Sequence, residues 1–196
     1  MFIDISQELF SCAVYPGDEQ PQRRTPQLIK NGDVCNLTEL SMCAHNGTHI
    51  DAPYHFIDDG LTVDQLPLET LIGDCYVSFH SGDVTAADAG SILEKARAAG
   101  AGERILIGGD ATVTADAAKV FADASIKLIG NESQTVGPVD APKQVHLTLL
   151  GKGVVLLEGI RLGGVKEGRY RLIAAPLNLG GSDGSPCRAV LETLEV

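Results

Sequence analysis

Four side chains that can bind a metal or move a proton lie within eleven residues of one another: His45, His49, Asp51 and His55. Neutral imidazoles and a carboxylate suit a borderline divalent ion such as zinc or manganese. Three protein ligands would leave coordination positions open for water and a substrate, which is typical of a catalytic site. A lone histidine is usually a structural polar residue, but this density of histidines favours a metal site.

The spacing of these side chains predicts the shape of their segment. In an extended chain they would share one face, yet His45 and His49 would lie roughly 13 Å apart. Ligands of one metal lie about 2.0–2.2 Å from it, so the segment must bend. Gly47 has the backbone freedom for that bend, and Pro53 stiffens the chain before the last histidine. We therefore predict a bend at Gly47 that brings two imidazoles and one carboxylate together.

Two residues far along the chain can complete such a site. His146 falls in a segment predicted as a short helix, and Glu158 directly follows the apolar run Val154–Leu157. Folds of the α/β class place much of their chemistry at the carboxyl ends of buried strands. Together the two residues can add one nitrogen and one oxygen ligand to the first cluster. By contrast, we interpret His80 as a satisfied polar residue and Cys43 as a small buried hydrophobe rather than a ligand or nucleophile.

The elements that must position these residues alternate between strands and helices after residue 75, which predicts an α/β domain with parallel or mixed pairing. The first third is strand-like, and its strands are expected to extend or flank that sheet. An alternating pattern predicts a half-buried strand that leads into the histidines. We predict helices over Thr85–Gly100, Thr114–Ala122 and Gln144–Leu150, and strands over Phe2–Ile5, Leu37–Cys43, Cys75–His80, Arg104–Ile107, Ile126–Ile129, Val154–Leu157, Tyr170–Ala174 and Arg188–Leu194.

Length and composition limit the class of protein. The 196 residues suit a single domain over 1–196, and 44% hydrophobic with 21% charged residues is ordinary for a globular protein. No apolar run approaches the roughly 20 residues of a membrane helix. The net charge of −11, without a Lys/Arg cluster to offset it, argues against nucleic acid as a partner.

The expected partner is therefore a small-molecule substrate. Arg188 is a candidate for steadying an anionic group, with a structural ion pair as an equal alternative. The five cysteines lack a C-x-x-C pattern, and the N-terminus does not read as a signal peptide. We expect a cytoplasmic protein with reduced thiols.

A family resemblance rests on these same residues. The signature of the cyclase-like metal-dependent hydrolases, which include bacterial kynurenine formamidases and isatin hydrolases, is similar to the segment His45-Asn-Gly-Thr-His49-Ile-Asp51-Ala-Pro-Tyr-His55. The likeness extends over most of the chain, through Asp4-Ile-Ser, Tyr15-Pro-Gly-Asp18 and Gly181-Ser-Asp-Gly-Ser185-Pro186-Cys-Arg188. The chain departs from the family pattern over Asn131–Pro138 and at Gly184, where Ala is usual.

The resemblance implies a fold and a set of roles. The fold is a swivelling β/α/β domain with a mixed sheet. The first two histidines and the aspartate of the signature bind a divalent metal, and its last histidine is the catalytic acid/base; here these are His45, His49, Asp51 and His55. Formamidase-like members complete a two-zinc site with a distal histidine and a glutamate twelve residues later, a spacing that is met by His146 and Glu158.

The metal and the assembly follow from the same resemblance. We expect zinc, two ions per subunit, with manganese as the alternative, because isatin-hydrolase-like members use a single manganese. Family members form dimers or tetramers in which N-terminal segments contribute to a neighbour's site. A homodimer or homotetramer is therefore expected.

The predicted activity is hydrolysis of an amide C–N bond, in an aryl formamide or a cyclic amide, by metal-activated water. His55 would pass a proton to the leaving nitrogen. Two alternatives stay open: a cyclase, dehydratase or ring hydrolase acting on a lactone or isatin-type substrate with the same metal site, and a non-catalytic metal-binding or interaction module.

Overall fold

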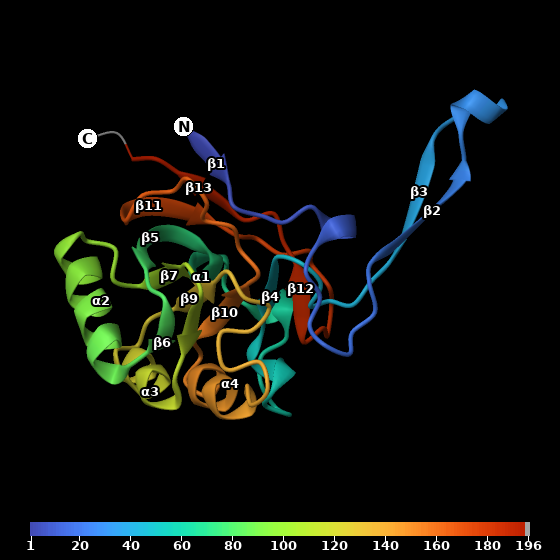
Figure 1. Ribbon diagram of the computed structural model, residues 1–196. Coiled ribbons are helices and arrows are strands. Elements are labelled where there is room, and N and C mark those ends of the chain that lie inside the picture. Colours follow the sequence, from blue (N-terminus) through green and yellow to red (C-terminus); the bar gives the residue numbers. More distant parts are fainter. Residues whose placement is uncertain (195–196) are drawn as a thin grey trace.

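A nine-stranded mixed sheet forms the centre of the computed structural model, which describes residues 1–194 (Figure 1). The strand order is β1-β13-β11-β5-β7-β9-β10-β4-β12. The central strands β5, β7, β9 and β10 run parallel, and the strands on both flanks pair antiparallel. In chain order the strands are β1 (Phe2–Asp4), β4 (His49–Asp51), β5 (Ile72–Phe79), β7 (Arg104–Gly108), β9 (Leu128–Asn131), β10 (Val155–Glu158), β11 (Gly168–Ile173), β12 (Gly184–Pro186) and β13 (Val190–Glu192).

Both faces of the parallel part of the sheet are buried. Along β7, Ile105 and Ile107 belong to one hydrophobic cluster, whereas Leu106 between them belongs to another. The first cluster includes buried residues of the three longest helices, which lie together along one face of the sheet in Figure 1. Burial on both faces explains why the central strands are continuous apolar runs in the sequence rather than alternating ones.

Two of the helices begin at capping threonines. Thr85 and Asp88 form a capping box at the start of α2 (Ala86–Ala98). The hydroxyl of Thr114 accepts a hydrogen bond at the start of α3 (Ala115–Asp123). The remaining helices and short elements are α1 (Leu68–Leu71), α4 (Lys143–Leu150), the 3-10 turns η1 (Leu9–Ser11), η2 (Ile29–Asn31), η3 (Pro53–His55) and η4 (Val63–Gln65), and the paired strands β6 (Gly82–Val84) and β8 (Ala111–Val113).

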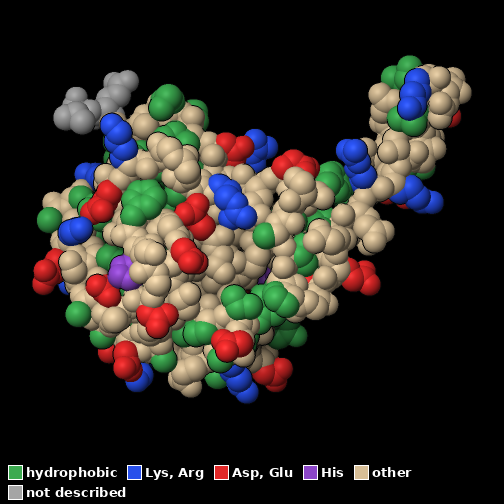
Figure 2. All heavy atoms as spheres, viewed as in Figure 1, with side chains coloured by type: hydrophobic (Ala, Val, Ile, Leu, Met, Phe, Trp, Pro, Cys, Tyr) green, Lys and Arg blue, Asp and Glu red, His purple; other side chains and the backbone are tan. Residues whose placement is uncertain are grey.

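One predicted strand has a different environment from the one expected. β2 (Gln22–Gln27) and β3 (Leu37–Ser41) pair with each other as an arm that projects from the body (Figure 1). Every residue of both strands is exposed, and Figure 2 shows hydrophobic and basic side chains together on this arm. The prediction over Leu37–Cys43 is therefore confirmed for the strand and wrong for its half-burial, because the arm carries β3 away from the main sheet. β1, in contrast, does extend that sheet through β13.

The expected α/β class with a mixed sheet is confirmed. The predicted domain runs to residue 196, and its last two residues lie outside the part that the structure describes. Within residues 1–194, no helix combines the length and the apolar character needed to cross a bilayer.

Candidate metal centre

The short strand β4 positions the centre of the site. It is paired on one side with β10, where His49 lies opposite Glu158, and on the other with β12, where Asp51 lies opposite Gly184. Because side chains two apart in a strand point to the same face, His49 and Asp51 face the same way. The sheet register thus brings Glu158, more than one hundred residues later in the chain, directly opposite the first cluster.

The bend predicted at Gly47 is present. Gly47 has φ +66, in the left-handed region where a side chain is strained, and it separates His45 from β4. Its carbonyl oxygen lies 3.0 Å from Nδ1 of His49. That contact leaves Nε2 of His49 facing the carboxylates of the site.

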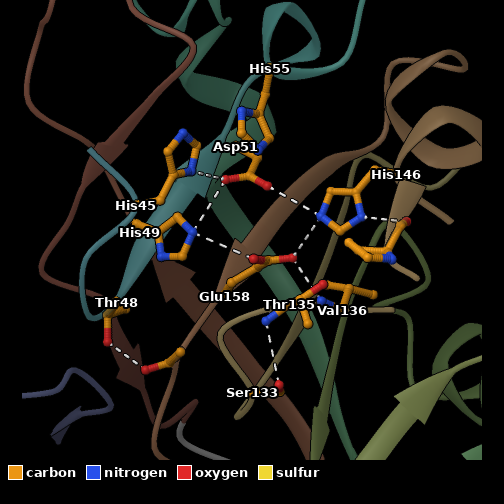
Figure 3. Close-up of polar contacts among 12 residues, drawn as sticks. His45, Thr48, His49, Asp51, His55, Ser133, Thr135, Val136, His146 and Glu158 are labelled. Atoms are coloured by element: carbon orange, nitrogen blue, oxygen red, sulfur yellow. Dashed lines mark hydrogen bonds and ion pairs between the residues drawn. The ribbon is translucent and has the colours of Figure 1, made fainter. Parts of the chain in front are cut away.

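Three imidazoles converge on the two oxygens of Asp51 (Figure 3). Oδ1 lies 2.8 Å from Nδ1 of His45 and 3.3 Å from Nε2 of His49. Oδ2 lies 3.6 Å from Nε2 of His146. The carboxylate of Glu158 bridges the other side, 3.5 Å from Nε2 of His49 and 3.3 Å from Nε2 of His146. All five side chains predicted from the sequence as metal ligands are thus in one place.

Backbone groups hold two of these side chains in orientation. Nδ1 of His146, on α4, lies 2.9 Å from the carbonyl oxygen of Pro142, so Nε2 faces the carboxylates. The amide of Val136 donates to Oε1 of Glu158 at 2.7 Å. Hydrogen bonds of this kind, from the far side of a ligand, fix the ring or carboxylate orientation in metal sites.

The donors fit a divalent cation. Two groups of ligand atoms, each within 4.8 Å of one another, are contributed by His49, Asp51 and Glu158 and by His45, Asp51 and His55. Asp51 belongs to both groups, and its Oδ2 is buried without a hydrogen-bond partner. A buried carboxylate oxygen without a partner is costly unless a cation meets it. Nitrogen and carboxylate donors of this number are typical ligands of zinc or a similar ion.

The electrostatics of the protein alone lead to the same conclusion. Burial acts to lower the pKa of His45 and of His49, but hydrogen bonds to carboxylates outweigh it and raise these pKa values to about 11 and about 9. The carboxylates are Asp183 and Asp51 for His45, and Asp51 and Glu158 for His49. Burial likewise acts to raise the pKa of Asp51, yet the two imidazoles hold it well below its usual range. Imidazolium protons therefore balance the buried carboxylates, and a metal ion would displace those protons.

Asp183 is the site residue that the sequence reasoning missed. Its Oδ2 lies 2.9 Å from Nε2 of His45 and 2.9 Å from Nδ1 of His55. Hydrogen bonding to His45, then the nearby imidazole charges, hold the pKa of Asp183 well below its usual range. The segment Gly181–Arg188 was noted as part of the family likeness, and that was the available signal, but nothing in its spacing assigned a role to the aspartate.

The site opens onto a cavity of about 410 Å³. His55, on η3, stands at its side with the imidazole partly exposed, and the ring of Phe56 packs edge-on against it at 4.7 Å between centroids. Tyr15 and Gln134 line the same space. A larger cavity of about 700 Å³ at the root of the arm contains none of the histidines.

Of the other candidate residues, Arg188 and His80 lie away from the site, whereas Cys43 lies at its cavity. Arg188 is exposed and forms an ion pair with Asp4, which is the structural role expected as the alternative to binding an anionic group. His80 contacts the carbonyl oxygen of Asp83 at 3.0 Å, as expected of a polar residue away from the site. Cys43 lines the cavity with an intermediate exposure, so it is less buried than expected.

Comparisons with known proteins assign the family. Residues 3–138 match the model of the Cyclase family, "Putative cyclase". The chain belongs to this cyclase family. The kynurenine formamidase of Salinibacter ruber is 34% identical over 203 residues, which cover 96% of each protein. The kynurenine formamidase of Bacillus mycoides is 34% identical over 211 residues, which cover 98% of each.

Two solved structures share this architecture. One, described as a potential metal-dependent hydrolase with cyclase activity, has a TM-score of 0.82 at 29% identity and covers 100% of this chain and 99% of that one. Isatin hydrolase A of Labrenzia aggregata has a TM-score of 0.84 at 21% identity, covers 100% and 94%, and supports the fold alone. The resemblance found in the sequence is confirmed.

Proposed function

We propose that this cyclase-family protein is a metal-dependent hydrolase that cleaves the C–N bond of an amide, either an aryl formamide or a cyclic amide. The observation that carries the proposal is the convergence of three imidazoles on both oxygens of Asp51, with Glu158 facing two of these imidazoles, beside a cavity large enough for a small molecule. Relatives that match over nearly their whole length are kynurenine formamidases, which supports the formamide class.

The proposed ligands are Asp51, Glu158 and the three imidazoles that face these two carboxylates. We assign the ion or ions to His45, His49, Asp51, His146 and Glu158, with zinc, two per chain, as the first choice and manganese as the second. When bound, such a metal supplies a Lewis acid that lowers the pKa of water towards neutrality and polarises a carbonyl oxygen. The shared position of Asp51 in both donor groups supports a bridging role for it.

The chain's own catalytic residue in this proposal is His55. It stands at the cavity, beside but not within the buried donor group of His49, Asp51 and Glu158. In hydrolysis, water adds to the amide carbon and the C–N bond breaks. His55 takes a proton from the attacking water and gives it to the leaving nitrogen, so the products are an acid and an amine. Phe56 and Tyr15 supply apolar ring surface for a flat substrate.

The cavity argues against a purely structural metal module. A structural zinc site is closed, with all four positions filled by protein. Here the donors of both groups line a space shared with Tyr15, Phe56 and Gln134, which leaves room for water and a substrate.

We also propose a homo-oligomer, a dimer or tetramer, in which the β2–β3 arm packs on another copy. The arm carries large apolar side chains that are exposed in the single chain, namely Ile29, Val34, Leu37 and Leu40. It also carries three basic and two acidic residues, whereas the whole chain has a net charge of −11. Such an arm suits an acidic, partly apolar surface of a second copy. A cytoplasmic location is proposed with it, supported by the five unpaired cysteines.

The test of the function is a product assay on protein stripped of metal and reloaded with zinc or manganese. We expect release of acid and amine from aryl formamides or ring opening of cyclic amides, only in the reloaded protein. Net loss of water from a hydroxy acid would instead identify a cyclase or dehydratase. Equal turnover by stripped and reloaded protein would contradict metal dependence.

A further inference from the structure

One carboxylate oxygen contacts two histidines at the edge of the site. Oδ2 of Asp183 lies 2.9 Å from Nε2 of His45 and 2.9 Å from Nδ1 of His55. An ionised carboxylate can only accept hydrogen bonds, so both facing nitrogens carry hydrogen. The contact therefore assigns hydrogen to Nδ1 of His55 and to Nε2 of His45. Nε2 of His55 remains for chemistry, whereas Nδ1 of His45 faces Asp51, where a metal ion would displace its hydrogen.

His55 needs this contact more than its neighbours do. Among residues 1–194, Asp183 provides the only hydrogen bond to its imidazole. The ring otherwise touches aromatic surfaces, with His45 at 4.0 Å and Phe56 at 4.7 Å between ring centroids. Packing of this kind restrains the plane of the ring but does not choose between its two nitrogens.

The backbone around Asp183 is tied to the segment that carries His55. The amide of Ala52, which precedes η3, donates to the carbonyl oxygen of Asp183 at 2.9 Å. The carbonyl oxygen of the preceding residue, Ser182, accepts a hydrogen bond from the amide of Val63 at 2.9 Å. The carboxylate and the imidazole are thus attached to neighbouring, hydrogen-bonded stretches of chain, and their relative position is set by the fold.

We propose that Asp183 is a positioning residue: its carboxylate keeps His55 in the tautomer with hydrogen on Nδ1, which leaves Nε2 free to exchange protons with reactants. The same oxygen holds His45 so that Nδ1 is presented to the metal. Carboxylates that orient a catalytic or ligand histidine in this way are a recurring device in enzyme sites. The part that concerns catalysis rests on the proposed function, whereas the tautomer of His55 does not.

The first test is the ¹⁵N NMR spectrum of the imidazoles in zinc-loaded protein. The chain has five histidines, and His55→Ala assigns the signal of interest. We expect hydrogen on Nδ1 of His55 in the wild type and a shift towards the Nε2–H tautomer in Asp183→Asn. Asp58→Asn removes an exposed carboxylate three residues after His55 and should leave the signal unchanged. An Nε2–H tautomer in the wild type, or no change in Asp183→Asn, would overturn the proposal.

The second test is a double-mutant cycle at saturating metal. Asp183→Asn should lower kcat by about 10²-fold, the usual size of an acid–base contribution, with KM little changed. In the His55→Ala background the same substitution should lower kcat by less than about 3-fold, because residues that act as a unit are not additive. An equal loss in both backgrounds would show that Asp183 acts independently of His55. If wild-type protein hydrolyses no amide, the proposed function fails, and the NMR result still decides the role of Asp183.

Discussion

Asp51 is the residue at which the two donor groups of the site meet. Its Oδ1 faces His45 and His49, and its Oδ2 faces His146. Because Oδ1 contacts one imidazole of each group and Oδ2 faces a third imidazole, this single side chain could contact two ions or fix the geometry around one. Because one carboxylate has all these contacts, the site depends on the neighbouring residues that fix the plane of this carboxylate.

Loss of Glu158 should lower the affinity of the site for metal. Replacing it in Glu158→Gln keeps an oxygen for the amide of Val136 but removes the charge that faces His49 and His146. We expect metal affinity to fall by at least about 10-fold. The measurement is a competition titration with a chelator. Glu167→Gln, which breaks a surface pair with Lys95, should bind metal normally; full affinity in Glu158→Gln would remove Glu158 from the ligand set.

His55 should separate catalysis from metal binding. In His55→Ala we expect kcat to fall by about 10²-fold or more while metal content stays near that of the wild type, because an acid–base group is lost and the buried donors remain. Metal content by mass spectrometry and steady-state kinetics measure the two effects. A collapse of metal content would show that His55 is a ligand, as its place in the group with His45 and Asp51 also allows.

At the residue scale, chemical type and spacing were sufficient for most of the site. The density of histidines around Asp51 located the centre, and Glu158 was found because it ends an apolar strand. Asp183 could not be found in that way. Its role depends on β12 pairing with β4, a contact between segments far apart in the chain that no local pattern encodes.

At the scale of elements, the bend before β4 is the feature that a single substitution should disturb most. Gly47→Ala would place a side chain at φ +66 and a Cβ 3.1 Å from that of Cys12. We expect a loss of about 1–2 kcal/mol from the left-handed backbone, together with weaker metal binding as the bend relaxes. Gly153→Ala is the matched control, because it has φ +75 but no atom within 4 Å.

Urea unfolding and chelator competition measure the two effects of these variants. Gly153→Ala should lose a similar free energy of unfolding and keep its metal affinity. Unchanged metal affinity in Gly47→Ala would mean that the bend is not what brings His45 to the site.

The elements that could be predicted are those whose signals are local. The capping box of Thr85 and Asp88 marked the start of α2, and burial on both faces made β7 and β10 recognisable as apolar runs. The short strand β12 has no such signal, because its three residues are Gly, Ser and Pro and it exists only through pairing with β4. Whether β3 is buried or exposed also depends on where the chain places the strand. The alternation of polar and apolar residues within β3 does not determine that.

At the scale of the whole molecule, metal should reverse the response of stability to pH. Without metal, the pKa values of His49 and His45 are raised to about 9 and about 11 in the folded protein, against about 6.5 when unfolded. The contribution of these two histidines to the free energy of unfolding is therefore complete below about pH 6.5. It is lost as the pH rises towards their pKa values in the folded protein. With metal bound the imidazoles must be neutral, so raising the pH strengthens binding and with it the folded state.

The prediction is that the free energy of unfolding falls between pH 6.5 and 8.5 in chelator-treated protein and rises over the same range in metal-loaded protein. Urea titrations at a series of pH values measure it. Thiols of the unfolded chain, which titrate at about pH 8.5, contribute equally in both forms, so the difference between the two slopes is the readout. Parallel slopes in the two forms would contradict the assignment of His45 and His49 as ligands.

The β2–β3 arm has one more consequence. Two strands without a third are marginally stable in water, and β3 ends at Ser41, only four residues before His45. If a second copy steadies the arm, it also steadies the segment that enters the site. Turnover per chain should then fall on dilution, and an excess of catalytically dead His55→Ala chains should restore it. The abundance of the protein would in this way set not only how many enzymes are present but how well each one works.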